Sequence, residues 1–357
     1  MSKSKVFFQT VKNSKDKVQV AAKFKELIKQ SKLCEDFKKD EIVAIKTHMG
    51  EKGNTGHVDA QVIKVLIDKL KSKATKPFIT DTNVLYHGNR VNAVDHLILA
   101  HEHGFCLEKL GAPVIICDGL LGENAEDITI NKKHFEKVSI AKPVLYLDNI
   151  VSIAHVTGHL LTGFAASIKN MGMGFASRAG KLKQHSNIKP TVRENNCVLC
   201  RRCIENCPVS AIIEKEKHVF IDQNICIGCA ECIVACKFNA ICDNYGENAK
   251  ILSEKMVEYA YGVLKHPKKK VFFNFALRIT KNCDCMAKDE PNIVEDLGIF
   301  ASNDPVACDK AAAEMVIAQA KEDIFKKVYP NADVYINQLN YAQEIGLGNL
   351  EYELIRI

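Results

Sequence analysis

Two runs of cysteines constrain this chain more than any other feature. Within 357 residues the pattern C-x2-C-x2-C-x3-C occurs twice, once at Cys197, Cys200, Cys203 and Cys207 and again at Cys226, Cys229, Cys232 and Cys236. In this pattern one tight loop supplies three thiolates to a [4Fe-4S] cluster, and the fourth cysteine of the run ligates the other cluster. The spacing therefore predicts two [4Fe-4S] clusters.

The predicted ligand sets cross between the two runs. The first cluster takes three cysteines from the first run and one from the second, namely Cys197, Cys200, Cys203 and Cys236. The second cluster takes the complementary set, Cys226, Cys229, Cys232 and Cys207. Because each cluster joins both runs, it would hold together the two halves of a segment that has little core of its own.

Zinc knuckles and a disulfide framework are the alternatives to iron-sulfur clusters. Zinc sites generally use pairs of cysteines or histidine partners rather than four cysteines in one run. A disulfide framework is disfavoured because the chain has 15 cysteines, an odd number. Closely spaced cysteines also seldom meet the geometry that a disulfide requires.

The segment from Pro190 to about Asn248 resembles a bacterial two-cluster 4Fe-4S ferredoxin. Both cysteine runs continue into the dipeptide Ala-Ile, as Cys207-Pro-Val-Ser-Ala-Ile and as Cys236-Lys-Phe-Asn-Ala-Ile. The second run has Lys237 where the first has Pro208, which changes local rigidity and not ligation. The resemblance implies one-electron transfer at low potential, roughly −400 mV.

Outside this segment, apolar runs alternate with amphipathic stretches. The runs predict strands at 6–9, 42–47, 78–81, 114–117, 150–155, 271–276 and 352–357. The amphipathic stretches predict helices at 16–33, 58–70, 91–103, 249–263 and 305–324. This alternation indicates an α/β fold with a largely parallel sheet.

The alternating pattern continues on both sides of the cysteine segment, which Pro190 and Gly246 flank. We therefore predict an α/β host domain in two parts, residues 1–188 and 249–357. Between them, residues 189–248 form a small inserted α+β ferredoxin-type domain with two [4Fe-4S] clusters. Both ends of such an insertion return to the same surface of its host.

A second resemblance covers nearly the whole chain. The motifs that carry it are Asp81 to His96, Gly158 to Gly174, Ser177 to Lys181, Cys283-Asp-Cys285-Met, and Ser302 to Ala307. They are similar to the uncharacterised iron-sulfur centre proteins, a family in which a ferredoxin is inserted into a domain of unknown function. The resemblance implies a fold and no particular reaction.

The segment from His155 to His185 is the richest in chemical groups. It combines histidines, basic residues and glycines: His155, His159, Lys169, Asn170, Arg178, Lys181 and His185, with Gly158, Gly163, Gly172, Gly174 and Gly180. We expect the glycines to let the backbone approach a ligand and the basic residues to hold an anionic group. No P-loop, dinucleotide or zincin motif is present. The alternative is that these side chains only cap a loop.

Within this segment, the order of His159, Lys169 and His185 is similar to the central motif of the nickel-pincer lactate racemase family. The resemblance implies that Lys169 holds a nicotinate-derived nickel cofactor, that His185 ligates the metal and that His159 lies near the substrate. We therefore predict these residues as catalytic, and a further metal or organic cofactor in the host domain is the corresponding hypothesis.

Cys283 and Cys285 complete the candidate catalytic residues. A C-x-C pair does not close into an unstrained disulfide, so the spacing predicts a metal or cluster-edge ligand pair or a thiol nucleophile. Two ordinary loop thiols are the alternative. A charged loop with Lys46, His48, Glu51 and Lys52 follows a buried strand and is interpreted either as a ligand wall or as a solvated loop.

These features favour a cytoplasmic iron-sulfur oxidoreductase from a niche with little oxygen, which binds a redox partner protein or a small substrate. The net charge of +6 is a poor sign of nucleic-acid binding, because each oxidised cluster adds roughly two negative charges and the chain has no tryptophan for base stacking. No apolar stretch is long enough to span a membrane, and the first ten residues lack a signal-peptide core. The alternatives are a metal-dependent racemase-like enzyme and a pure electron carrier.

Overall fold

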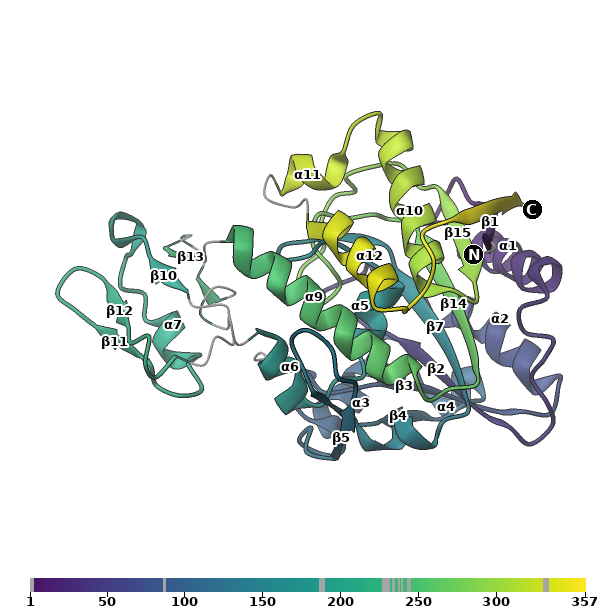
Figure 1. The fold of residues 1–357 in the computed structure, drawn as a ribbon, viewed down its shortest axis with the longest axis horizontal. Coiled ribbons are helices and arrows are strands. Elements are labelled where there is room, and N and C mark those ends of the chain that lie inside the picture. The colour runs from purple at the N-terminus through teal and green to yellow at the C-terminus, as the bar shows by residue number, and fades with distance from the viewer. Residues whose placement is uncertain are drawn as a thin grey trace.

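An eight-stranded sheet forms the centre of the computed structural model (Figure 1). The structure describes residues 3–85, 88–185, 190–226, 232, 235–236, 238, 240–242, 245–329 and 334–357. The strand order is β16-β1-β15-β14-β7-β2-β3-β4. The strands are β1 (Ser4–Thr10), β2 (Ile42–Thr47), β3 (Lys76–Asp81), β4 (Val114–Ile116), β7 (Asn149–His155), β14 (Lys269–Ala276), β15 (Gly298–Ser302) and β16 (Tyr352–Arg356).

The sheet is largely parallel, as the sequence predicts. Strands β14, β7, β2, β3 and β4 pair in parallel, and so do β1 and β16. Strand β15 runs antiparallel to both of its neighbours, β1 and β14. All seven predicted strands lie in this sheet, whereas β15 was not predicted from the sequence.

Helices cover both faces of the sheet (Figure 1). One face carries α1 (Lys17–Ser31) and α2 (Ala60–Lys71), and the other carries α5 (Ser167–Gly172), α9 (Tyr245–Leu264), α10 (Pro305–Ala320) and α12 (Val334–Glu344). Successive side chains of β2 alternate between the two apolar cores, with Val43 and Ile45 in one and Ala44 in the other. Shorter helices are α3 (Ala93–Glu102), α4 (Leu107–Leu110), α6 (Arg178–His185) and α11 (Ile324–Val328).

Side-chain caps fix where several of these helices begin. The Asp59 carboxylate accepts a hydrogen bond from the backbone N–H of Gln61 at the start of α2. At the start of α10, the Asp304 carboxylate accepts from Val306 and Ala307, and Pro305 occupies the first helical position. Helix α10 therefore begins at residue 305, where the amphipathic pattern predicts it.

The cysteine segment lies beside the host, next to α6 and α9 (Figure 1). Its elements are β10 (Thr191–Val192), η2 (Glu194–Asn196), α7 (Arg202–Glu205), β11 (Ile212–Glu214), β12 (Val219–Ile221) and β13 (Ile241–Cys242). Strand β10 pairs antiparallel with β13, so the segment begins and ends at neighbouring strands. This arrangement is consistent with an insertion, although the domain limits remain a prediction.

Small elements complete the host. The antiparallel pairs are β5 (Ala125–Thr129) with β6 (Lys137–Ala141), and β8 (Thr157–His159) with β9 (Gly163–Ala165). A short helix, η1 (Lys142–Tyr146), follows β6. None of the helices in the described residues has the length and apolar composition needed to cross a membrane.

Candidate functional site

A cavity of about 230 Å³ lies at the carboxyl ends of the parallel strands. It is lined by residues at or just after the ends of three strands: Lys46 and His48 for β2, Asp81 and Thr82 for β3, and His155 and Thr157 for β7. Open parallel sheets characteristically bind ligands at this edge. A cavity of this size suits a small molecule.

The five predicted catalytic residues all line this one cavity: His159, Lys169, His185, Cys283 and Cys285. They come from β8, α5, α6 and the loop after β14, so more than 120 residues of sequence separate the first from the last. The structure brings them together, while their catalytic roles remain predictions.

Helix α5 is held at its first turn and along one side. The Asp309 carboxylate of α10 accepts hydrogen bonds from the backbone N–H groups of Ser167 and Ile168, both at 2.9 Å. The amide of Asn170 donates to the backbone oxygen of Lys46 at 3.1 Å and to the Ser152 hydroxyl at 2.9 Å. These bonds fix the helix that carries Lys169 against the ends of β2 and β7.

Lys169 is a cationic group of the cavity without a partner of its own. Among the described residues, no hydrogen bond or ion pair reaches its Nζ. Burial lowers the pKa of Lys169 to about 8, and the nearby Asp284 carboxylate opposes that shift. At neutral pH most of the Lys169 side chains are therefore protonated and can bind an anion.

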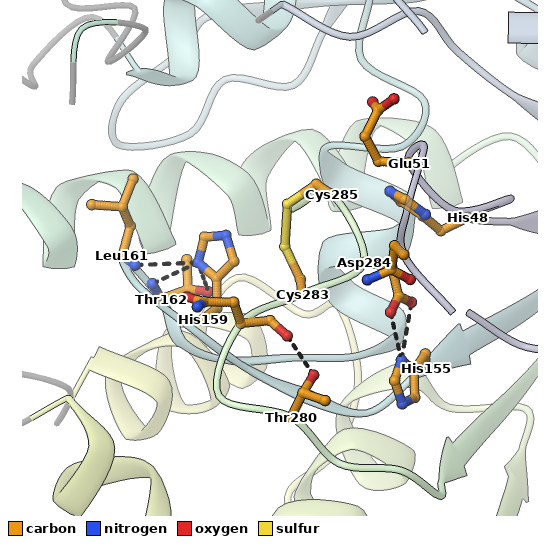
Figure 2. Close-up of a disulfide and its surroundings, with 12 residues drawn as sticks. His48, Glu51, His155, His159, Leu161, Thr162, Thr280, Cys283, Asp284 and Cys285 are labelled. Atoms are coloured by element: carbon orange, nitrogen blue, oxygen red, sulfur yellow. Dashed lines mark hydrogen bonds and ion pairs between the residues drawn. A yellow bond between two sulfur atoms is a disulfide. The ribbon is translucent and has the colours of Figure 1, made fainter. Parts of the chain in front are cut away.

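His159 faces the cavity as a neutral imidazole. Its Nδ1 accepts hydrogen bonds from the backbone N–H groups of Leu161 at 3.3 Å and Thr162 at 3.1 Å (Figure 2). Burial holds the pKa of His159 well below its usual value, and the charge of Lys169 adds to this shift. The proton of the ring is therefore on Nε2, which makes His159 a hydrogen-bond donor and disfavours a metal at that nitrogen.

His185 is also neutral. Burial lowers its pKa to about 4, with a further contribution from Lys169. Its buried Nδ1 has no hydrogen-bond partner among the described residues. A buried nitrogen without a partner costs free energy, so a bound ligand that supplies one would be stabilised there.

The structure joins Cys283 and Cys285 by a disulfide (Figure 2). The spacing was interpreted as a metal or cluster-edge ligand pair, a thiol nucleophile or two ordinary loop thiols. In this structure the two sulfurs are bonded to each other, and the chemical role of the pair stays a prediction. The two Cα atoms lie 5.4 Å apart. The loop folds so that both sulfurs lie on one side while the Asp284 side chain between them points away toward His155 (Figure 2).

His155 and Asp284 form a buried ion pair that anchors this loop. Nδ1 of His155 donates to both Asp284 carboxylate oxygens at 3.0 Å, and Nε2 donates to the backbone oxygen of Leu277 at 2.7 Å. Burial alone would lower the pKa of His155, but the Asp284 charge and these hydrogen bonds outweigh it and raise the pKa. Conversely, burial would raise the pKa of Asp284, but His155 holds it below its usual value.

Charged residues other than the five predicted catalytic residues also line the cavity. Nζ of Lys46 lies 2.9 Å from Oδ1 of Asp81, and Nη1 of Arg90 lies 3.6 Å from the other carboxylate oxygen, Oδ2. Nζ of Lys181 donates to the Thr82 hydroxyl at 2.6 Å. The sequence interpretation of the charged loop after β2 placed Lys46 correctly beside a cavity, but gave Asp81 and Arg90 no role. Asp81 ends β3 and Arg90 lies in the loop that follows, so both could have been identified as cavity residues from their position at the carboxyl end of that strand.

Several glycines of this region are required by the packing of the chain against itself. A Cβ atom on Gly174 would lie 2.1 Å from the backbone oxygen of Asn170, and one on Gly172 would lie 2.3 Å from that of Met256. On Gly158 it would meet the backbone oxygen of Lys281 at 2.4 Å. Of the five glycines between His155 and His185, Gly163 has a positive φ, of 70°. The predicted close approach of this backbone to a ligand stays a prediction.

The cysteine segment contains a smaller cavity, of about 20 Å³, lined by all four predicted ligands of the first cluster: Cys197, Cys200, Cys203 and Cys236. Cys236 thus lies with the first run, as crossed ligation requires. In both halves a backbone N–H four residues after the last cysteine donates to its sulfur, from Ala211 to Cys207 at 3.2 Å and from Ala240 to Cys236 at 3.3 Å.

The second predicted ligand set is described in part. Cys207, Cys226 and Cys232 all lie at the small core of the segment, whereas Cys229 lies outside the described residues. Cysteine sulfurs that accept backbone N–H groups, and that gather around a small cavity and core, fit an iron-sulfur cluster. Among the described cysteines of the two runs, none is in a disulfide.

Comparison with known proteins adds a family and a distant fold likeness. Residues 43–314 match the family model described as a domain of unknown function, DUF362. No curated protein matches the chain. The lactate racemase apoprotein from Thermoanaerobacterium thermosaccharolyticum aligns at 13% identity and a TM-score of 0.40, over 84% of this chain and 54% of that one. A structural-genomics target from Thermotoga maritima aligns at 13% identity and 0.41, over 84% and 59%. The chain spans little more than half the length of either structure.

Proposed function

The chain belongs to the DUF362 family, to which no reaction is assigned, and we propose that it is a cytoplasmic iron-sulfur oxidoreductase that acts on a small anionic substrate. Its inserted ferredoxin-type segment binds two [4Fe-4S] clusters, and its α/β domain binds the substrate in the cavity at the carboxyl edge of the sheet. A redox partner protein supplies or removes the electrons.

The observation that carries this proposal is the position of Cys236. It comes 33 residues after Cys203, yet both line one cavity together with Cys197 and Cys200. When bound, each cluster would take up and release one electron at low potential. The chain's own part is to hold the sulfurs, to donate backbone hydrogen bonds from Ala211 and Ala240, and to shield the site with the small core.

The anionic character of the substrate follows from the charges in the cavity. Lys46, Arg90 and Lys181 have partners within the protein, and Lys169 has no described partner that neutralises it. His159 offers an Nε2–H donor beside it. A carboxylate or phosphate group would supply the missing acceptor for both.

Anaerobic purification with iron and sulfide analysis tests the cluster assignment. We expect about eight iron atoms per chain and, after reduction with dithionite, the electron paramagnetic resonance signal of [4Fe-4S] clusters. Cys236→Ala should lose about half of the iron. Cys34→Ala is the matched control, because Cys34 is buried in the host core and should not change the iron content. Zinc in place of iron, or full iron in Cys236→Ala, would contradict the proposal.

A racemase-like or isomerase activity is the second candidate function. It is favoured by the meeting of Lys169, His159 and His185 at one cavity, since groups with lowered pKa values can exchange protons with a substrate. Cys200→Ser separates the two functions. It should abolish turnover if electrons are required and leave turnover unchanged if proton transfer suffices, whereas Lys169→Ala should impair either reaction.

A further inference from the structure

We propose that Cys283 and Cys285 are a redox-active pair that exchanges electrons with a small anionic disulfide, or its dithiol, bound in the cavity. The inference rests on the proposed function for its electron supply. The assignment of the pair itself rests on the geometry of the C-x-C loop.

The pair differs from the other cysteines of the host in its surroundings. Both sulfurs belong to residues that line the cavity with Lys169 and His159. By contrast, Cys34 and Cys117 are buried in the apolar cores, where burial raises the pKa of their thiols to about 12 and about 11. Thiols of that kind do not form thiolates at neutral pH and are unreactive.

The loop is held by bonds that do not involve sulfur. Asp284 is paired with His155, its backbone oxygen accepts a hydrogen bond from the Glu51 N–H at 3.2 Å, and the N–H of Met286 donates to the backbone oxygen of Cys283 at 3.1 Å. Because none of these bonds depends on the disulfide, they can hold the two sulfurs close together when the disulfide opens. A pair kept close in both states can form and break its bond reversibly.

The exposures of the two residues give the order of the reaction. Cys285 is half-buried, whereas Cys283 is only 8% exposed, so the Cys285 thiolate is the attacking group. It attacks one sulfur of the bound disulfide, forms a mixed disulfide and releases the first substrate thiolate. The Cys283 thiolate then attacks Cys285, releases the second thiolate and restores the protein disulfide.

Electrons and protons balance in this exchange. The substrate disulfide gains two electrons and becomes two thiols, and the two protons come from the thiols of Cys283 and Cys285. The ammonium group of Lys169 binds the anionic group of the substrate throughout. A low-potential one-electron reductant, used twice with two protons from water, regenerates the protein dithiol.

Trapping the mixed disulfide tests the inference in the full-length protein. The Cys283→Ser variant is first reduced and then mixed with 3,3′-dithiodipropionate. One of the two thiol halves of the probe should stay bound to Cys285 as a mixed disulfide, which peptide mass spectrometry detects. The neutral 2-hydroxyethyl disulfide should react at least about tenfold more slowly, since Lys169 does not attract it. Lys169→Met should remove that preference.

Matched variants keep the outcome interpretable. Cys34→Ala should leave the trapping on Cys285 unchanged, and Cys285→Ser should abolish it. Labelling of Cys34 or Cys117 to the same extent, or failure of the wild-type pair to take up alkylating reagent after reduction, would overturn the inference. Iron analysis of the same samples separates the two proposals. Trapping without iron would leave the pair assigned and refute the proposed function, whereas clusters without trapping would refute only the pair.

Discussion

The host cavity and the cysteine segment differ in how much apolar core surrounds them. The cavity of the host domain lies against a sheet with a large apolar core on each face. The described core of the cysteine segment is small: Cys203, Ile212, Val219, Ile221, Cys232 and Ile241. Packing alone can therefore form the host cavity before any ligand binds. Under the proposed function, the cysteine segment depends on the clusters that its sulfurs bind.

Removal of iron should separate the two regions most strongly. After anaerobic chelation, residues 190–226 should lose amide protection against hydrogen exchange by about 100-fold or more, because the proposed metal-sulfur bonds would supply most of their stability. Residues 42–47 of β2 should keep their protection, since they lie in the large sheet. Equal loss in both segments, measured by hydrogen-exchange mass spectrometry, would show that the two regions are not independently stabilised.

Breaking the His155–Asp284 pair should be the largest effect within the host. Asp284→Asn leaves His155 without its counter-charge, and we expect a loss of about 3–5 kcal/mol in the free energy of unfolding near pH 6. Because the pKa of His155 is raised in the folded state, its contribution is complete below about pH 6.5 and declines as the pH rises through the folded-state pKa. Urea denaturation at pH 6 and pH 9 measures this. A destabilisation as large at pH 9 as at pH 6 would refute the ion pair as its source.

Lys169→Met should stabilise the host while it impairs the site. Folding lowers the pKa of Lys169 from 10.5 to about 8, so below pH 8 the folded state bears the full cost of a buried ammonium. Removing the charge should raise the free energy of unfolding by up to about 3 kcal/mol at pH 7. The gain should shrink between pH 8 and 10.5, where the folded state loses its proton before the unfolded state does. Thermal denaturation across this pH range is the measurement. If Lys169→Met were less stable than the wild type, the conclusion that the Lys169 ammonium is buried without a neutralising partner would be wrong.

The smallest effect should come from a surface ion pair of the cysteine segment. Arg201 donates from Nε to Glu214 at 2.6 Å and from Nη2 at 3.0 Å, but the Arg201 side chain is 66% exposed. Since water screens such pairs, Arg201→Gln should leave the proteolysis rate of the segment unchanged within error. A clear acceleration would show that polar contacts, and not the sulfurs alone, hold the segment together.

The alternation of apolar and polar residues was sufficient to predict most of the sheet. Seven strands were recovered because the buried runs are short and separated by amphipathic helices. Strand β15 (Gly298–Ser302) was not predicted, because it follows a long loop with no helix between it and β14. Its place between β1 and β14 depends on pairing across nearly 300 residues, which a local pattern does not encode.

The sequence also identified some residues of the candidate site and not others. Lys169 and His185 were identified from a dense local motif, and the structure places both at the cavity. The packing role of the glycines in that motif was not predicted, because the groups that crowd them, such as the backbone oxygen of Met256, come from distant parts of the chain. The Asp309 carboxylate that fixes α5 gave no local sign of that role.

The sequence by itself determined the cysteine pattern, the α/β class and the residues able to do chemistry, since these depend on spacing and on residue type. The tertiary structure alone decided which of them meet. It placed Cys236 beside Cys203, put Cys283 and Cys285 in the same cavity as Lys169, and paired Asp284 with His155 at the wall of that cavity. Such meetings depend on how distant segments pack together, and packing is a property of the whole fold.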